Sequence, residues 1–174
     1  WITSRGLGDV YKRQILYRAA EMIESRSDSF VEELVALFGA TKAAANREVE
    51  ASIDRLVHFA GWSDKYSQVF SAVNPVASSH FNFSSPEATG VVGIVSPDSP
   101  GLLGMISLIA PAILSGNTAV VISSETAPLP AITLAEALAT SDLPGGVVNL
   151  LTGIRSELAP WLAGHMDVLS LIHI

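Results

Sequence analysis

Short apolar runs alternate with helix-length segments between Gly90 and Gly153, and this alternation is the most informative pattern in the chain. The runs at 91–95, 118–122 and 147–151 are nearly continuous in Val, Ile and Leu, which is typical of strands covered on both faces. The spacing between successive runs fits one crossover helix each. The pattern therefore predicts a parallel α/β unit of the dinucleotide-binding kind, in which the strands at 91 and 118 lie side by side.

The segments between these runs predict the covering helices. Residues 102–114 are apolar all round, as in a helix buried between two layers, whereas residues 129–139 carry a one-sided apolar stripe after Pro128. Residues 142–146 have turn composition, and residues 156–163 predict a third, shorter helix. The expected architecture is a doubly wound sheet.

Before Gly90, apolar residues recur at helical spacing. They predict helices over 15–24, over 30–38 with a stop at Gly39, and over 41–60 with Thr41 at its start. Ser29 followed by Glu32 has the signature of a capping box for the second of these helices.

A polar region separates the helices from the α/β unit. Residues 61–79 are rich in Ser and contain the turn signal Asn74-Pro75, which predicts a loop. Residues 80–84 then alternate polar and aromatic side chains, as an exposed edge strand or an oligomer contact does.

Both ends of the chain lack this regularity. Residues 1–14 have neither a helical nor a strand period and lack the features of a signal peptide, and we interpret them as non-native flanking sequence. Residues 169–174 have the same interpretation, with a fourth strand as the alternative. We therefore expect a helical segment with an edge strand over 15–89 and a partial dinucleotide-binding unit over 90–168.

Composition excludes several classes of function. The chain has 174 residues, enough for one domain, a formal net charge of -7 and no cluster of Lys or Arg, which argues against nucleic acid and anionic membranes as partners. The uncharged window 99–124 is interrupted by Pro and Gly and predicts no membrane span. We expect a soluble, cytoplasmic protein.

The residues that usually bind metals or attack substrates are scarce. The chain contains no cysteine, so these residues supply no disulfide, no thiolate ligand and no thiol nucleophile. The four histidines are scattered without metal-ligand spacing. We predict no metal site.

Candidate binding residues follow the predicted strands, because ligands of open parallel sheets lie beyond the carboxyl ends of the strands. A carboxylate such as Glu125 accepts hydrogen bonds from a ribose diol and repels a 2′-phosphate, which predicts NAD over NADP. The alternative is that Glu125 only favours the positive end of the following helix. Gly153 allows close approach of a sugar or base, or serves turn geometry alone. The three strand-end turns are Ser96-Pro97-Asp98-Ser99, Ser123-Ser124-Glu125 and Thr152-Gly153.

Two motifs are familiar, GNTAVVISSE at 116–125 and LPGGVVNLLTG at 143–153. Together with the helical lead-in, they resemble the cofactor domain of the aldehyde dehydrogenase superfamily over about 14–168. That domain binds a dinucleotide without the G-x-G-x-x-G fingerprint, which is also missing here. The resemblance implies N-terminal helices plus an incomplete, truncated doubly wound parallel sheet of Rossmann type. The stretch from Ser96 to Thr118 most resembles the second, incomplete module of two-module, family-16-type members.

The resemblance also assigns roles to residues. It implies cofactor contacts from Ser96, Pro97, Asp98, Ser124, Glu125 and Gly153 and places Ser99 where the family has the Asn that stabilises the oxyanion. Loss of such a donor costs on the order of 3 kcal/mol in the transition state. Ile122 stands at the place of a ribose-binding Lys, which implies weakened or lost NAD binding. No catalytic residue is expected in this chain. The family's Cys, Glu base and glycine motif belong at positions after its last residue, and truncation and loss of these residues both remain open.

Three functions remain open on these grounds. The first is part of an NAD(P)-dependent oxidoreductase that converts an aldehyde to a carboxylate, with this segment inactive alone. The second is a non-catalytic, pseudoenzyme module that assembles with an active partner, and the third is an unrelated nucleotide-binding domain. The incomplete sheet predicts an exposed edge and association, either as a homo-oligomer or with a catalytic module.

Overall fold

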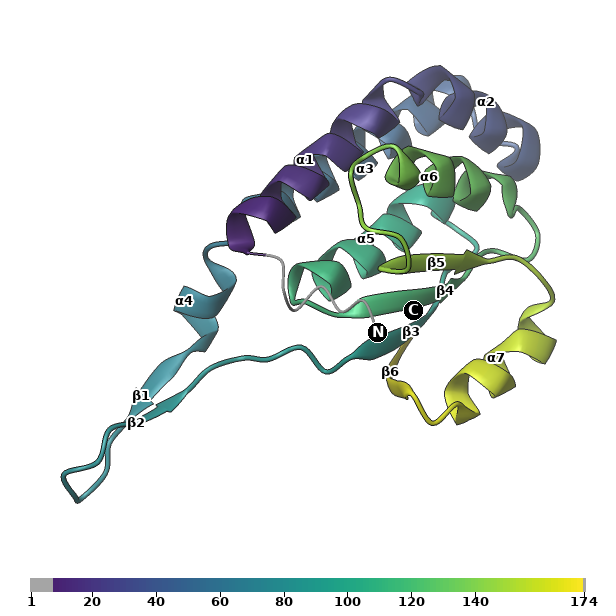
Figure 1. Cartoon of the computed structure of the whole chain (residues 1–174). Coiled ribbons are helices and arrows are strands. Elements are labelled where there is room, and N and C mark those ends of the chain that lie inside the picture. The colour runs from purple at the N-terminus through teal and green to yellow at the C-terminus, as the bar shows by residue number, and fades with distance from the viewer. Residues whose placement is uncertain (1–7, 174) are drawn as a thin grey trace.

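The computed structural model describes residues 8–173 and contains a four-stranded sheet with helices on both faces (Figure 1). The helices are α1 (Asp9–Glu24), α2 (Ser27–Phe38), α3 (Lys42–Ala60), α4 (Tyr66–Phe70), α5 (Gly101–Leu114), α6 (Leu129–Ala139) and α7 (Arg155–Gly164). The strands are β1 (Ala72–Asn74), β2 (Asn82–Ser84), β3 (Val91–Val95), β4 (Thr118–Ile122), β5 (Val148–Leu151) and β6 (Val168–His173).

All pairs in the main sheet are parallel, and the strand order is β5-β4-β3-β6. Val91 is opposite Thr118 and Val95 is opposite Ile122, so the predicted side-by-side pairing of these two strands is confirmed. The chain moves outward from β3 through β4 to β5 and then returns to the other side of β3 with β6. The structure therefore confirms the expected α/β fold with a parallel sheet.

The two faces of the sheet are covered differently. Helices α5 and α6 lie on one face with α1, α2 and α3 beyond them, and α7 lies on the opposite face (Figure 1). Alternation along the strands places Val92, Ile94, Ala119 and Val121 in the main core with α5 and α6. Val120 and Ile122 point the other way and line a cavity beside α7.

The all-apolar segment is buried as predicted. Most of α5 is buried between the sheet and α3, and the turn at 115–117 separates it from β4. Within residues 8–173, no helix combines the length and the hydrophobicity that crossing a membrane requires.

The helical region differs from expectation at its element ends. Helix α1 begins at Asp9, before the predicted start at residue 15, because Lys12 pairs with Asp9 and Arg13 pairs with Asp64 outside the apolar stripe. Residues 9–14, which we interpreted as flanking sequence, are therefore helical, and their origin stays a prediction. Residues 1–7 lie outside the described part.

The capping-box prediction is wrong. Helix α2 begins at Ser27, two residues before Ser29, and Arg26 is its N-cap without a side-chain hydrogen bond. The other two predicted helix ends are confirmed. Gly39 ends α2 with a φ of 63°, and the Thr41 hydroxyl accepts a hydrogen bond from the Ala44 amide at 3.2 Å.

The predicted exposed strand pairs outside the main sheet. β2 is antiparallel to β1, and this two-stranded hairpin extends away from the body of the molecule together with α4 (Figure 1). Neither α4 nor β1 was predicted, because elements of 5 and 3 residues are too short to show a period.

The last described residues form a strand. β6 pairs with β3 at the edge of the sheet, which is the fourth-strand alternative for this end. Its side chains alternate between half-buried and exposed, so the strand is only partly covered.

Candidate functional site

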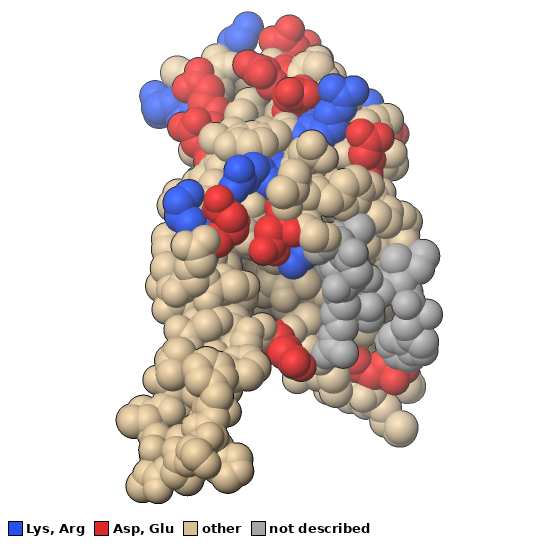
Figure 2. Space-filling model, turned by 60° about the vertical axis from the view of Figure 1, so that its left-hand side comes forward, with Lys and Arg blue, Asp and Glu red and all other residues tan. Residues whose placement is uncertain are grey.

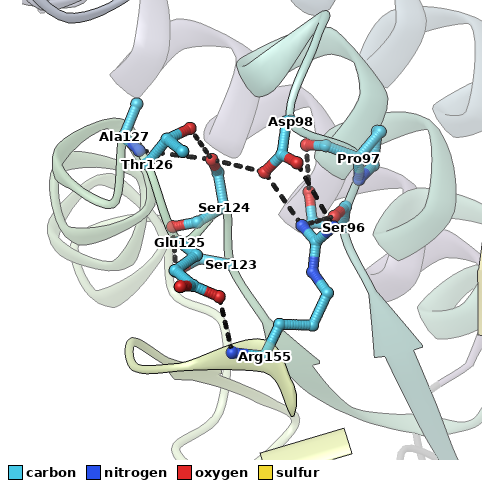
Figure 3. Close-up of polar contacts among 9 residues, drawn as sticks. All are labelled: Ser96, Pro97, Asp98, Ser123, Ser124, Glu125, Thr126, Ala127 and Arg155. Atoms are coloured by element: carbon cyan, nitrogen blue, oxygen red, sulfur yellow. Dashed lines mark hydrogen bonds and ion pairs between the residues drawn. The ribbon is translucent and has the colours of Figure 1, made fainter.

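The carboxyl ends of β3, β4 and β5 meet at one edge of the sheet, and hydrogen bonds join their turns (Figure 3). Ser124, directly after β4, is the centre of this network. Its hydroxyl donates to Asp98 Oδ1 at 2.8 Å and accepts from the Ala127 amide at 3.2 Å. The turn after β3 is thus tied to the turn after β4, as the sequence predicted from the ends of these strands.

Arg155, the first residue of α7, binds the same turn from the other side (Figure 3). Its guanidinium donates to Asp98 Oδ1 at 2.9 Å, to Asp98 Oδ2 at 3.3 Å and to the Ser96 carbonyl at 2.8 Å. Such a two-pronged contact with a carboxylate is among the stronger polar interactions in proteins. The Nε atom is buried and has no hydrogen-bond partner among the described residues.

Glu125 joins the turns after β4 and β5. Its Oε2 accepts a hydrogen bond at 2.9 Å from the Arg155 backbone amide, at the N-terminus of α7. Glu125 therefore caps α7 and not α6, the following helix that the sequence alternative favoured. A carboxylate at a helix N-terminus is favourable because unpaired amides and the helix dipole give that end a partial positive charge. The side chain is otherwise exposed.

The first turn of α5 packs against the turn that follows β3. Gly104 lies against the Pro97 ring so closely that a Cβ on Gly104 would overlap that ring. Glu48 of α3 accepts hydrogen bonds from the Leu102 and Leu103 amides at 2.9 and 3.3 Å and thereby caps α5. Ser99, at the expected oxyanion position, is exposed just before this helix.

The turn after β5 is the most exposed of the three. Thr152 and Gly153 are exposed, and Gly153 has a φ of 156°, which L side chains rarely adopt. A Cβ there would also lie 2.9 Å from Leu158 Cδ1. The turn geometry itself therefore requires a glycine.

The structure brings most predicted site residues together. Contacts link the turns of Ser96, Asp98, Ser124 and Glu125, and the Ser96 amide also donates to the Ile122 carbonyl at 2.9 Å. Ser123 is buried behind them, and its amide donates to the Leu151 carbonyl at 2.9 Å. Sequence reasoning missed Arg155. The available signal was a lone cation two residues after Gly153, at the end of a predicted strand.

The formal charges of this site sum to -1, from Asp98, Glu125 and Arg155. No group of three His, Cys, Asp or Glu side chains within residues 8–173 is arranged to hold a metal ion.

Comparison with known proteins places this arrangement in a family. A family model described as "Aldehyde dehydrogenase family" matches residues 9–172. The chain is 31% identical over 162 residues to D-glyceraldehyde dehydrogenase (NADP(+)) of Thermoplasma acidophilum, an alignment that covers 93% of this chain and 32% of that protein.

Solved structures agree in fold. An NAD+ complex of an aldehyde dehydrogenase from Bacillus cereus superposes with a TM-score of 0.91 over 96% of this chain and 34% of that one, at 22% identity. Glyceraldehyde-3-phosphate dehydrogenase GapN from Methanocaldococcus jannaschii, complexed with NADP, gives a TM-score of 0.86 at 27% identity, over 97% of this chain and 37% of that one. This chain spans about a third of the length of these three proteins.

Proposed function

The chain belongs to the aldehyde dehydrogenase family, and from that premise we propose that it forms part of the dinucleotide-binding domain of an NAD(P)-dependent aldehyde-oxidising enzyme. The observation that carries the proposal is the linked set of turns at the carboxyl ends of three parallel strands, where open sheets of this kind bind their ligands. The resembling proteins were solved with NAD+ in one case and NADP in another.

The exposed side chains at this edge fit a dinucleotide. Glu125 is exposed and has one carboxylate oxygen outside the α7 cap, so it can accept a hydrogen bond from a ribose hydroxyl. Among the other proposed contacts, Asp98 and Gly153 are exposed and Pro97 is half-buried, whereas Ser96 and Ser124 are buried. When bound, the nicotinamide group accepts a hydride. The residues of this chain bind and orient the dinucleotide, while a nucleophile comes from elsewhere, since the chain contains no cysteine.

We propose NAD as the preferred cofactor. A 2′-phosphate near Glu125 and Asp98 would face two carboxylates and one guanidinium. The net charge of these three groups is negative and therefore disfavours the negatively charged phosphate. A plain ribose diol meets no such repulsion.

Calorimetric titration of the chain with NAD+ and NADP+ tests this proposal. We expect tighter binding of NAD+. Glu125→Gln keeps an acceptor for the Arg155 amide but removes the negative charge. It should therefore lower the ratio of NAD+ affinity to NADP+ affinity about tenfold, or roughly 1.4 kcal/mol. Glu157→Gln is the matched control, because Glu157 is also in the first turn of α7, and it should leave the preference unchanged. Tighter binding of NADP+ by the unaltered chain would refute the NAD preference.

A non-catalytic module is the second candidate function. Ser99 and Ile122 stand where the family pattern has Asn and Lys, and Ile122 is fully buried against the α7 cavity, so it offers no polar contact to a ribose. Absence of NAD+ and NADP+ binding at millimolar concentration, combined with stable self-association, would favour this candidate over the enzymatic one.

Self-association is proposed through the hairpin. Phe81 and Phe83 are 74% and 62% exposed, and no charged residue lies between Lys65 and Glu87. Figure 2 shows the hairpin free of the charges that cover the helical layer. An isolated two-stranded hairpin is only marginally stable in water. We therefore propose that a second copy of this chain packs on the exposed aromatic side chains of the hairpin. Sedimentation of Phe81→Ser with Phe83→Ser should show loss of association. We also propose that the protein is located in the cytoplasm.

A further inference from the structure

The Arg155 side chain crosses the edge at which the proposed cofactor would bind. It starts at α7, after β5, and its guanidinium contacts Ser96 and Asp98, after β3 (Figure 3). Because β4 lies between β5 and β3, this side chain spans the carboxyl end of β4. It is half-buried there and closes the turns on one another.

A nucleotide at this edge would compete with the Arg155 side chain for the same place. A ribose that reaches Glu125 must approach the ends of β4 and β5. The Arg155 side chain crosses this place, from its backbone amide at Glu125 to its guanidinium at Asp98, after β3. The polar groups that would receive the ligand are thus largely satisfied by the chain itself.

The geometry points to Arg155 as a positioning residue that keeps the dinucleotide site closed, so that ligand binds after the guanidinium leaves Asp98. This inference rests on the proposed function. The closed state is imperfect, because Nε is buried and without a hydrogen-bond partner among the described residues. Opening exposes Nε to water and offsets part of the cost of breaking the ion pair.

A role for Arg155 as a phosphate ligand is less favoured. Its charge is already opposed by Asp98 at 2.9 Å, and Glu125 adds a second carboxylate at the same edge. A phosphate would have to displace one carboxylate and face the other.

Calorimetric titration of Arg155→Ser with NAD+ is the principal test. Removal of the partly exposed ion pair should tighten NAD+ binding about tenfold relative to the unaltered chain. The matched control is Arg18→Ser, because Arg18 also pairs with a carboxylate, Glu21, but on the outer surface of α1. It should leave the affinity unchanged, although the net charge changes equally.

Two further measurements separate positioning from a general effect on folding. Arg155→Lys keeps the charge but lacks the planar guanidinium that makes the two-pronged contact with Asp98. Its affinity for NAD+ should therefore fall between those of the unaltered chain and Arg155→Ser. Raising KCl from about 0.05 to 0.5 M should reduce the difference in NAD+ affinity between Arg155→Ser and the unaltered chain, since salt screens the partly exposed ion pair of Arg155 and Asp98.

The outcomes are distinguishable. NAD+ binding by the unaltered chain that is equal to or tighter than that of Arg155→Ser overturns the inference and leaves the proposed function standing. Loss of NADP+ binding alone in Arg155→Ser would identify a phosphate ligand and also overturn it. If no variant binds NAD+ or NADP+, the proposed function fails and the inference fails with it. Circular dichroism of each variant verifies that it is folded.

Discussion

The two faces of the sheet differ in how far this chain covers them. On the α5 and α6 face, strand residues join a continuous core that reaches through both helices to α1, α2 and α3. On the other face, α7 leaves a cavity of about 430 Å³ beside it, and Trp161 of that helix is 80% exposed. From this difference in burial we expect the covered face to carry most of the folding free energy, whereas the α7 face contributes Arg155 to the candidate site.

The largest expected effect is on the free energy of unfolding, when one leucine on each face of the sheet is truncated and the two losses are compared. Leu134 of α6 is 1% exposed in the core, so Leu134→Ala should lower the free energy of unfolding by about 3–4 kcal/mol through lost burial and a new cavity. Leu162 of α7 is 8% exposed and already borders the cavity, so Leu162→Ala should cost only about 1–2 kcal/mol. Urea unfolding of both variants measures the difference, and equal losses would refute the asymmetry.

A smaller effect should come from the polar contact between α3 and α5. Glu48→Ala leaves the Leu102 and Leu103 amides without their acceptor and should cost about 1–2 kcal/mol. Glu50→Ala, an exposed position on the same helix, is the control and should change the unfolding free energy by less than about 0.5 kcal/mol. Urea unfolding distinguishes these values. A similarly small loss of unfolding free energy in both variants would show that the Glu48 contact does not stabilise the covered face.

The smallest effect concerns Glu33, between α2 and α6 on the covered face. Burial raises the pKa of its carboxyl group, and the hydrogen bond from Thr133 only partly opposes this. The folded state therefore favours the neutral carboxyl group more than the unfolded state does. The stability that Glu33 contributes is full below its ordinary pKa and is lost as pH rises through the raised pKa.

Glu33→Gln keeps a neutral side chain at every pH. It should raise the melting temperature at pH 7 by a few degrees at most and leave it unchanged near pH 4. Thermal unfolding at both pH values measures this, with the exposed neighbour Glu32→Gln as control. A lower melting temperature of Glu33→Gln at pH 7 would contradict the direction of the pKa shift.

Local sequence pattern was sufficient to predict the scaffold of the site. The parallel strands β3 and β4 follow from continuous runs of branched residues, and the end of α2 follows from Gly39, because both signals act over a few residues. From parallel strands alone, the meeting of the Ser96 and Ser124 turns could be expected.

Contacts between distant residues could not be predicted in the same way. Arg155 and Asp98 are 57 positions apart, and their pairing depends on how α7 is placed over the sheet. The start of α2 was missed for a related reason. Ser29 matched a local motif, but the chain turns from α1 into α2 at Arg26, before that motif.

The contact between Gly104 and Pro97 has a consequence for how substitutions at this edge would be interpreted. Any side chain at 104 must push the Pro97 ring, and with it the neighbouring Ser96 carbonyl, away from α5. In a saturation screen, position 104 would therefore be as intolerant as a ligand contact, although it is excluded from the surface. Shape, more than chemistry, is what that position contributes.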